Sequence, residues 1–393
     1  MSREVVILSA ARTPVGRFLG SLADIPASEL GAITIREALK RAGVDASEIQ
    51  EVVMGNVLQA GQGQNPARKA SIAAGIPDHV PAWTLNIVCG SGMKAVHVAA
   101  AAIKAGDADV MVAGGMENMS LAPYLIPRGR TGYRMGDGVL VDEMIKDGLQ
   151  CAMHDIHMGV TAENVAEEFC VTREVQDDIA YTSQQRAAAA IANGKFKAEI
   201  VPVEIPQKKG DPKIFDTDEH VRAETTREGL AGLKPAFRKD GTVTAGNASG
   251  INDAGAAFVV ASKEWADKKG IKPLATVVAY ATAALDPKIM GMGPYHATKK
   301  IFEISGLSLE DMDVIEANEA FAAQAGAVAQ ELGLEMAKVN LYGGAIAIGH
   351  PIGASGARIL TTLIHALKQE GGTYGLATMC IGGGQGVATI VKV

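Results

Sequence analysis

The 393-residue sequence has few aromatic side chains, few cysteines and no long apolar run. Phe, Trp and Tyr make up 4% of it, and the four cysteines have no C-x-x-C spacing, so neither a zinc site nor a disulfide framework is indicated. No run approaches the ~18 apolar residues of a membrane span, and the amino-terminal apolar run is too short for a secretory signal. These absences predict a soluble protein of the reducing cytoplasm, without a membrane partner.

The charge and the motifs that do not occur narrow the functional classes. A net charge of −7 argues against nucleic acid as a general partner. Hydrophobic residues make up 48% and charged residues 21%, without a low-complexity tract, which predicts a globular chain of two or three domains. Neither a P-loop nor a G-x-S-x-G motif occurs, so a nucleotide-binding fold or a serine-hydrolase elbow has little support.

Short β-branched runs alternate with Ala-rich helical stretches along the chain. This alternation predicts an α/β layered fold. The predicted strands are residues 5–9, 87–88, 110–113, 258–261, 276–279 and 375–380.

The chain also contains an internal repeat of two similar segments. From residue 86 a strand is predicted to enter "CGSG", followed by a helix over 93–105 that ends at Gly106 and a strand that ends in "AGG". From residue 345 a strand is predicted to enter "GHPIGASG", followed by a helix over 357–369 that ends at Gly371 and a strand into "CIGGG". The two segments look like copies of one βαβ design.

Residues 119–250 interrupt this alternation of predicted strands and helices. A helix is predicted over 173–193, with Thr172 as its N-cap and Gly194 as its stop. The stretch 195–239 is rich in basic residues and nearly as rich in acidic ones. Inserted loops often carry substrate contacts, although a solvated mixed-charge surface is an equal alternative here.

Cys89 lies in "NIVCGSGMK", where a short apolar run meets a cysteine, two glycines and a helix-forming stretch. That position is near a helix N-terminus, where free backbone N–H groups stabilise a thiolate. Gly90 and Gly92 permit a tight turn there. A reactive thiol and a small buried hydrophobe are both open interpretations of this residue.

His350 stands in the second copy where Cys89 stands in the first. Strand ends of the two halves of an α/β fold can meet at one crevice, so the thiol and the imidazole are predicted to be neighbours. A histidine there could take the thiol proton, and helix capping is the alternative.

Cys380 closes the second copy in "MCIGGGQG", where glycines 382–384 would let backbone N–H groups face a cleft. Two cysteines and a histidine suggest that one thiol becomes acylated while the other moves a proton. Asn318, in "EANEAFAAQ", is either a helix cap or an amide donor to a developing negative charge.

Seven motifs occur in order along the chain, and together they resemble the thiolase family, in particular its acetyl-CoA acetyltransferase type. They are "NIVCGSGMKA", "GGMENMS", "HMGVTAENVAEE", "TVTAGNASGINDAGAA", "EANEAFAAQ", "GGAIAIGHPIGASGAR" and "GLATMCIGGGQG". The resemblance covers essentially the whole chain.

The resemblance implies a thiolase fold, in which two similar βαβαβαββ halves form a five-layered αβαβα sandwich with an inserted loop domain. It implies an N-terminal half over residues 1–118 and 251–270, a loop domain over 119–250 that binds CoA and forms tetramers, and a C-terminal half over 271–393. A homotetramer is therefore expected, and the segment 121–138 resembles the tetramerisation loop.

The resemblance also implies roles in a reversible Claisen condensation of two acetyl-CoA to acetoacetyl-CoA and CoA. Cys89 would be the acetylated nucleophile, His350 the base that activates it, and Cys380 the acid/base that removes the α-proton of the second acetyl-CoA. Asn318, through a water, and His350 would form one oxyanion hole, and the N–H groups of Cys89 and Gly382 the other. No metal or separate cofactor is implied, because the CoA thioesters are substrates, and acylation of Cys89 first predicts ping-pong kinetics.

A tunnel for CoA is implied as well, with Arg222 nearest the phosphate and adenine end and His157 typical of short-chain biosynthetic thiolases. The residues implied to line it are Leu149, His157, Met158, Arg222, Ala245, Ser249, Ala320 and Phe321. Tyr342 and Arg227 depart from the residues common in the family, and neither removes a catalytic group.

Two other functions remain open. A degradative 3-ketoacyl-CoA thiolase of broader chain length would share these motifs, and a non-catalytic acyl-CoA or lipid-binding relative would share the fold. The complete set of Cys89, His350 and Cys380 argues against the second. A decarboxylating ketoacyl synthase would be expected to have a histidine at the position of Cys380.

Overall fold

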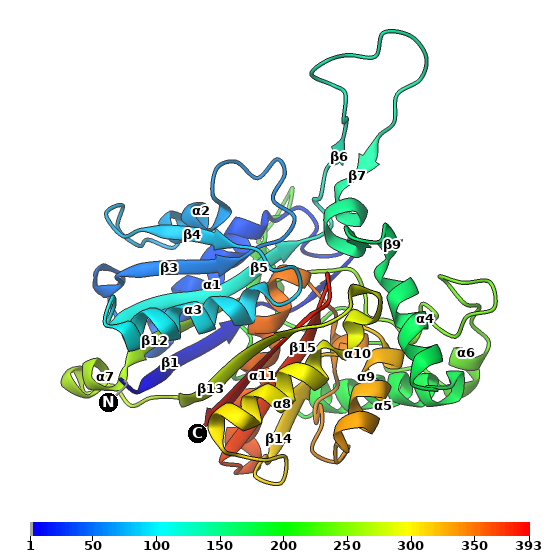
Figure 1. Ribbon diagram of the computed structural model, residues 1–393. Coiled ribbons are helices and arrows are strands. Elements are labelled where there is room, and N and C mark those ends of the chain that lie inside the picture. The colour runs from blue at the N-terminus through cyan, green and yellow to red at the C-terminus, as the bar shows by residue number, and fades with distance from the viewer. Residues whose placement is uncertain (1–2) are drawn as a thin grey trace.

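The computed structural model describes residues 3–393, and a ten-stranded mixed sheet runs through the whole molecule (Figure 1). The strand order is β14-β15-β16-β13-β1-β12-β5-β3-β4, with the short β2 pairing with β12. These strands are β1 (Val5–Arg12), β2 (Gly16–Arg17), β3 (Glu51–Gly55), β4 (Ala82–Leu85), β5 (Val110–Asn118), β12 (Asn252–Ser262), β13 (Ala275–Ala284), β14 (Val314–Ala317), β15 (Tyr374–Ile381) and β16 (Gln385–Lys392).

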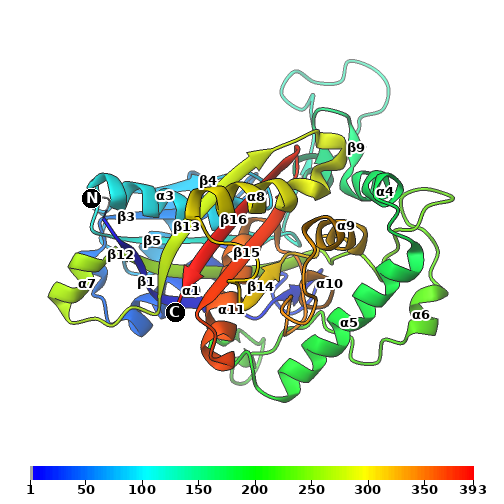
Figure 2. The ribbon, with the colours of Figure 1, turned by 60° about the horizontal axis from the view of Figure 1, so that its bottom comes forward.

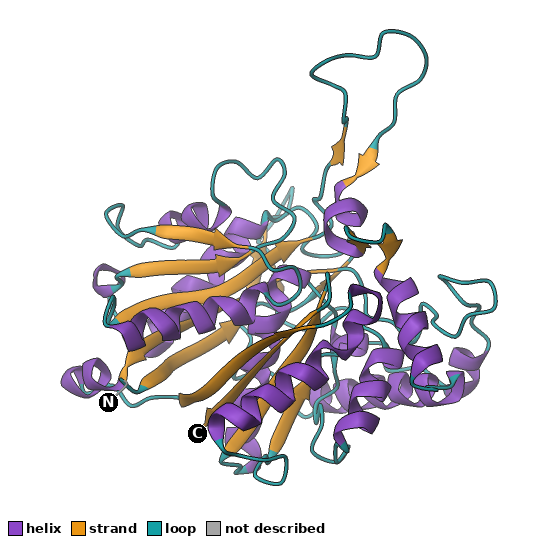
Figure 3. Ribbon diagram, viewed as in Figure 1, coloured by secondary structure: helices purple, strands orange, loops and turns teal. Residues whose placement is uncertain are grey.

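The sheet consists of two halves that meet at one short seam. β1 and β13 are antiparallel there, and the paired residues are Val6 with Thr276 and Ile7 with Ala275. On one side lie β1, β12, β5, β3 and β4, and on the other β13, β16, β15 and β14. Figure 3 shows the strands of both halves as one fan.

Helices form three layers around the two half-sheets. α1 and α2 cover the outer face of the first half, α8 covers that of the second, and α3 and α11 pack against each other between them. The main core surrounds this central helix pair and includes Met93, Val96, Leu360 and Leu363. The helices are α1 (Ala27–Ala42), α2 (Pro66–Ala73), α3 (Ser91–Ala105), α4 (Met158–Glu168), α5 (Arg173–Ala192), α6 (Arg227–Ala231), α7 (Lys263–Lys269), α8 (Gly293–Ser305), α9 (Ala322–Leu332), α10 (Ala345–Ile348) and α11 (Ile352–Glu370), with short turns η1 (Ala46–Glu48) and η3 (Pro287–Met292).

The two halves repeat one order of elements, as the internal sequence repeat predicts. The first half runs β1-α1-β3-α2-β4-α3-β5-β12, and the second runs β13-α8-β14-α9-α11-β15-β16. The place of β4 in the second half is taken by a single parallel bridge between Val339 and Ile315. Both central helices end at the predicted glycines, with φ +89° at Gly106 and +73° at Gly371.

Two predicted strands are wrong. β4 ends at Leu85, and residues 87–88 form a turn in which Val88 has φ +53°. Residues 345–348 form the short helix α10, because Gly344 and Gly349 bound a single helical turn. In both places the chain leaves regular structure just before Cys89 or His350, where sequence pattern gives least guidance.

Residues 119–250 contribute no named strand to the main sheet. Thr172 caps α5 as predicted, by accepting the Val175 N–H at 3.4 Å, and α5 lies beside α9 and α10 (Figure 2). The segment between β6 and β7 extends away from the body (Figure 1). The smaller elements of residues 119–250 are β6 (Tyr124–Leu125), β7 (Val141–Asp142), η2 (Met144–Leu149), β8 (Gln150–Cys151), β9 (Ile156–His157), β10 (Val203–Ile205) and β11 (Lys213–Phe215). The domain boundaries at 119 and 250 stay a prediction.

A membrane-spanning helix is absent from the described part of the chain, residues 3–393.

Candidate active site

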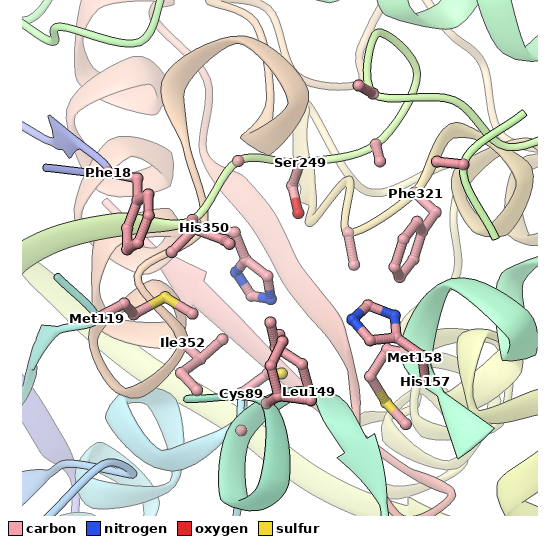
Figure 4. Close-up of a pocket in the computed structure, with 18 of the residues that line it drawn as sticks. Phe18, Cys89, Met119, Leu149, His157, Met158, Ser249, Phe321, His350 and Ile352 are labelled. Atoms are coloured by element: carbon pink, nitrogen blue, oxygen red, sulfur yellow. The ribbon is translucent and has the colours of Figure 1, made fainter. Parts of the chain in front are cut away.

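One cavity of about 470 Å³ brings together three segments that are far apart in the chain (Figure 4). Cys89 enters from the turn after β4, His350 from the turn before α11, and Cys380 from the end of β15. Apolar side chains, among them Met119 and Ile352, make up much of the wall. Such a concave apolar site with a few polar groups is the usual form of a small-molecule site.

A tight turn presents Cys89 to this cavity. The Ser91 hydroxyl donates to the Val88 carbonyl at 2.7 Å and accepts the Ile87 N–H at 2.9 Å. Val88 is held at φ +53°, which is rare for a β-branched residue and costs on the order of 1–3 kcal/mol. A Cβ at position 90 would overlap the side chain of Ile381, which would have to move for any larger residue. The packing of the turn, rather than local preference, therefore fixes the thiol.

The thiol of Cys89 is held in its neutral form. It is partly exposed to the cavity, but the apolar surroundings raise its pKa to about 11, against the opposing effect of N–H groups of Gly382 and Cys89 itself. The thiolate expected from a helix N-terminus is thus not the resting state, because desolvation exceeds the effect of the backbone donors. Formation of the thiolate requires a base.

His350 has one ring nitrogen bonded and one free. Its Nδ1 lies 2.6 Å from the Ser355 hydroxyl, which donates its own proton to the Pro351 carbonyl at 2.9 Å. Ser355 can therefore only accept from Nδ1–H, which leaves Nε2 as the basic nitrogen. Nε2 is buried without a partner in the described chain, so the helix-capping interpretation does not hold.

Burial, and secondarily the charge of Arg358, lower the pKa of His350 to about 3. The imidazole is therefore neutral at physiological pH, and the lone pair of Nε2 is unprotonated. Figure 4 shows its ring at the centre of the cavity, with that of His157 across from it. The peptide N–H of His350 is fixed by donation to Asn252 Oδ1 at 2.9 Å.

Cys380 is buried at the end of β15, and burial together with the neighbouring Cys89 raises the pKa of its thiol above the usual range. A thiol of raised pKa gives a strongly basic thiolate once it is deprotonated. This property suits a group that removes a weakly acidic proton.

Gly382 and Asn318 are outside the set of residues that line the cavity. The N–H of Gly382 nevertheless reaches the sulfur of Cys89. Asn318 follows β14, is buried, and has both side-chain polar atoms without a protein partner in residues 3–393. The N-cap of α9 is Phe321, so Asn318 does not cap that helix.

All eight residues expected to bind CoA line the same cavity. The rings of His157 and Phe237 stack at 4.9 Å between centroids, and Phe237 meets Phe321 edge to face at 6.2 Å. Arg222 and Ala245 also line an adjoining hollow of about 240 Å³.

Sequence reasoning missed several wall residues: Phe18, Met119, Ile145, His220, Phe237, Met290 and Ile352. Met119 and Ile352 lie within the motifs "GGMENMS" and "GHPIGASGAR". Their place in these motifs could have indicated that they lie near the site. Phe18 stands in a short turn near the amino terminus that carries no comparable pattern.

Two family models match the chain over nearly its whole length. The model described as "Thiolase, N-terminal domain" covers residues 5–264, and the one described as "Thiolase, C-terminal domain" covers residues 271–393. The chain belongs to the thiolase family. The predicted thiolase fold is confirmed, because a solved thiolase, the Bacillus anthracis acetyl-CoA acetyltransferase, superposes with a TM-score of 0.98 at 47% identity, over 100% of this chain and 99% of the other.

Curated thiolases are similar over the full length as well. An "Acetyl-CoA acetyltransferase" of Pseudomonas aeruginosa is 59% identical over 386 residues, 98% of each chain. One of Cupriavidus necator is 59% identical over 389 residues, 99% of each chain. One of Escherichia coli is 55% identical over 391 residues, also 99% of each chain.

In this thiolase the two unusual residues make local contacts away from the cavity. The Tyr342 hydroxyl donates to Glu370 at 2.6 Å, and Lys195 lies 5.2 Å from the centre of its ring. Arg227 lies 4.0 Å above the ring of Tyr181 and pairs with an exposed carboxylate. Neither residue lines the cavity.

Proposed function

We propose that this thiolase is an acetyl-CoA C-acetyltransferase, which joins two acetyl-CoA into acetoacetyl-CoA and CoA, reversibly and by a ping-pong mechanism. The observation that carries the proposal is the convergence of Cys89, His350 and Cys380 on one apolar cavity. Full-length relatives named acetyl-CoA acetyltransferase support the substrate.

In the first half-reaction, Nε2 of His350 would take the proton of Cys89, and the sulfur would attack the thioester carbonyl of acetyl-CoA. The bond from the carbonyl carbon to the sulfur of CoA then breaks, and the departing thiolate takes the proton of Cys380. Acetyl-Cys89, an imidazolium and the thiolate of Cys380 remain. The neutral thiol and the free Nε2 are the starting states that this step needs.

In the second half-reaction, the thiolate of Cys380 would remove the α-proton of a second acetyl-CoA. The imidazolium of His350 and a water held by Asn318 would stabilise the enolate oxygen while its carbon attacks acetyl-Cys89. The sulfur of Cys89 leaves and regains its proton from His350, so all groups return to their first state. The N–H groups of Cys89 and Gly382 would stabilise the tetrahedral oxyanion, and loss of one such donor costs about 2.7 to 4 kcal/mol of barrier.

CoA would lie along the eight expected residues, with its pantetheine arm against the apolar wall. Arg222, at the adjoining hollow, would meet the phosphate end. Thiol and imidazole supply the nucleophile and the base, so the proposed reaction needs no metal or further cofactor. All four cysteines are free, which fits the proposed cytoplasmic location.

Mass spectrometry after brief exposure to acetyl-CoA tests the proposal. A single acetyl group is expected on Cys89, and none in Cys89→Ala. An unmodified wild-type protein, or the same acetylation in the variant, would contradict it.

A broader 3-ketoacyl-CoA thiolase is the second candidate. A Staphylococcus epidermidis relative, 53% identical, is named "Probable acetyl-CoA acyltransferase", and apolar side chains such as Phe18 and Met119 extend the cavity wall. Cleavage of C4 and C8 3-ketoacyl-CoA substrates distinguishes the two. We expect a higher kcat/KM for C4, and a preference for C8 would favour the broader enzyme.

A further inference from the structure

One buried carboxylate accepts hydrogen bonds from both sides of the candidate active site. Glu117 is at the end of β5 and is fully buried. Its Oε1 accepts Asn56 Nδ2 at 2.7 Å and the Leu58 N–H at 3.2 Å, and its Oε2 accepts the N–H groups of Val57 at 3.0 Å and Gly353 at 2.9 Å. The reaction proposed above uses none of these contacts.

The first three donors belong to the loop that supports the Cys89 turn. The N–H of Asn56 donates to the Leu85 carbonyl at 3.0 Å, and Asn86 Nδ2 reaches the Val57 carbonyl at 3.5 Å. Leu85 ends β4, and Asn86 opens the turn that presents Cys89. Glu117 thus fixes the base of the nucleophile's turn.

The fourth donor, Gly353, is in the first turn of α11, directly after the segment that holds His350. A Cβ on Gly353 would lie 2.6 Å from Glu117 Oε2, so only glycine allows this contact. Cβ atoms on Gly92 or Gly115 would meet the Gly353 carbonyl. The first turns of α3 and α11 are therefore in close contact. Glu117 links the first turn of α11 to the loop of residues 56–58, which supports the Cys89 turn.

The N–H donors around Glu117 favour its ionised form, whereas burial opposes ionisation. Burial raises the pKa of Glu117 to about 8, with a further contribution from Glu143, and the N–H donors of Val57, Leu58 and Gly353 oppose this. Within residues 3–393, every hydrogen bond to Glu117 comes from an N–H donor, so a proton on either oxygen would face a donor. The charge also acts on the site, because it raises the pKa of the Cys89 thiol.

We propose that Glu117 is a positioning residue, a buried carboxylate that holds the Cys89 turn and the His350 turn at a fixed separation across the interface of the two halves. The inference rests on the proposed thiolase reaction. Glu117 touches no reacting atom and acts through the backbone of the two turns. Displacement of a reacting group by about 1 Å can cost on the order of 10²-fold in rate.

The test compares Glu117→Gln with the matched control Glu143→Gln. Glu143 is also buried, but it accepts the Ala60 N–H and touches neither turn. We expect kcat for acetoacetyl-CoA cleavage to fall about 10²-fold in Glu117→Gln, with KM within about threefold, and to stay within about twofold in the control. The amide keeps the size of the side chain but turns an NH₂ group toward two N–H donors.

A second measurement, made without substrate, reports how the charge of Glu117 affects the ionisation of the Cys89 thiol. Iodoacetamide forms a carbon–sulfur bond with a thiolate and releases iodide, so its rate against pH reports ionisation of the thiol. Modification of Cys89 must be followed by peptide mass spectrometry, since Cys170 is exposed and also reacts. Besides Glu117, the titratable groups His350, Cys380 and His157 line the same cavity as Cys89, and none of them is changed in the variant. Glu117, with a pKa of about 8, is charged in the alkaline range where the Cys89 thiol titrates. We therefore expect the midpoint for Cys89 to move to lower pH in Glu117→Gln, and an unchanged midpoint would contradict an effect of this carboxylate on the thiol.

Each remaining outcome is decisive. An unchanged kcat in Glu117→Gln, or an equal loss in Glu143→Gln, overturns the positioning role. If Glu117→Gln does not fold, Asn56→Ala replaces it, because that change removes one donor and leaves three; it is expected to lower kcat about tenfold, and an unchanged kcat overturns the proposal. Wild-type protein without thiolase activity would contradict the proposed function instead, so the two failures are distinguishable.

Discussion

The hydroxyl of Ser355 decides which nitrogen of His350 can accept a proton. Because that hydroxyl donates to the Pro351 carbonyl, it holds the proton of the imidazole on Nδ1. General acid–base catalysis of this kind contributes about 10²- to 10⁴-fold, and it depends on the correct tautomer. A single side chain outside the proposed reaction thus sets the tautomer of the proposed base.

Ser355→Ala is expected to lower kcat about 10- to 100-fold, because the ring loses both its orientation and its tautomer. KM for acetoacetyl-CoA should change less than about threefold. Steady-state kinetics measure both. Ser71→Ala is the control and should retain activity. It removes a buried hydroxyl of α2 that has no hydrogen-bond partner in the described chain. Equal kcat in wild type and Ser355→Ala would refute the role.

Cys380→Ala is expected to separate the two half-reactions. Water can protonate the departing CoA, so Cys89 should still be acetylated, whereas condensation should fall at least about 10²-fold without the base for the α-proton. Mass spectrometry measures the acetyl group, and a coupled assay measures condensation. Condensation at the wild-type rate would remove Cys380 from the mechanism.

His97 predicts a pH dependence of stability. Its ring is buried, bonded to Thr389 at 2.7 Å, and burial lowers its pKa to about 3. Between pH 6.5 and 3 the unfolded chain binds a proton that the folded chain excludes, so this group costs about 1.4 kcal/mol of stability per pH unit as the pH falls. His97→Gln should remove that slope. Urea unfolding at several pH values measures the difference, and parallel curves for wild type and variant would contradict the prediction.

At the scale of elements, the predictable parts are those that local rules decide. Thr172 caps α5, and Gly106 and Gly371 end the central helices, because capping and left-handed backbone depend on neighbours in sequence. The turn at Val88 and the helix α10 were not predictable. Packing against other segments sets both, and Gly90 against Ile381 is one such contact.

Close packing of α3, β5 and α11 predicts a stability effect at Gly115. A Cβ there would meet backbone atoms of Gly353, Gly92 and Ala354. Gly115→Ala is therefore expected to lower the free energy of unfolding by about 1–3 kcal/mol, since backbone cannot move aside cheaply. Denaturant unfolding measures it.

Gly232→Ala is the matched control, since its Cβ would be no closer than 3.5 Å to other atoms and its φ is −73°. It should be neutral or stabilising by up to about 1 kcal/mol. Equal losses in both variants would show that the junction is not tightly packed.

At the scale of the whole molecule, the loop between β6 and β7 carries apolar side chains into solvent. Met135 is 93% exposed, Val139 65% and Leu140 63%. Exposed apolar patches of this kind mark interfaces between subunits. The sequence resemblance led us to expect a homotetramer, and these side chains support that proposal.

Val139→Asp with Leu140→Asp is expected to reduce the assembly to a smaller oligomer, because burial of the two charges at an interface is costly. Light scattering measures the mass in solution. Ile304→Asp, an exposed apolar residue on α8, is the control and should leave the mass unchanged. A wild-type monomer, or an unchanged mass in the double variant, would contradict the tetramer.

The sequence predicts that Cys89 and His350 lie close together, but it does not predict the full wall of the cavity. Cys89, His350 and Cys380 stand in motifs whose glycines signal special backbone, and the structure brings them together. Phe18 reaches the same cavity from the turn that follows β2, and nothing near it in sequence indicates that. Long-range topology places it, and a single sequence does not encode topology in any local pattern.

The position of β1 has a consequence for how the protein is made. Its two neighbours in the sheet, β12 and β13, both lie beyond residue 251, so β1 leaves the ribosome long before either of them. A nascent chain thus carries an apolar strand with both edges open until most of the sequence has been translated. Such edges invite association with other chains, so co-translational folding of this enzyme calls for protection of β1 until β12 and β13 are made.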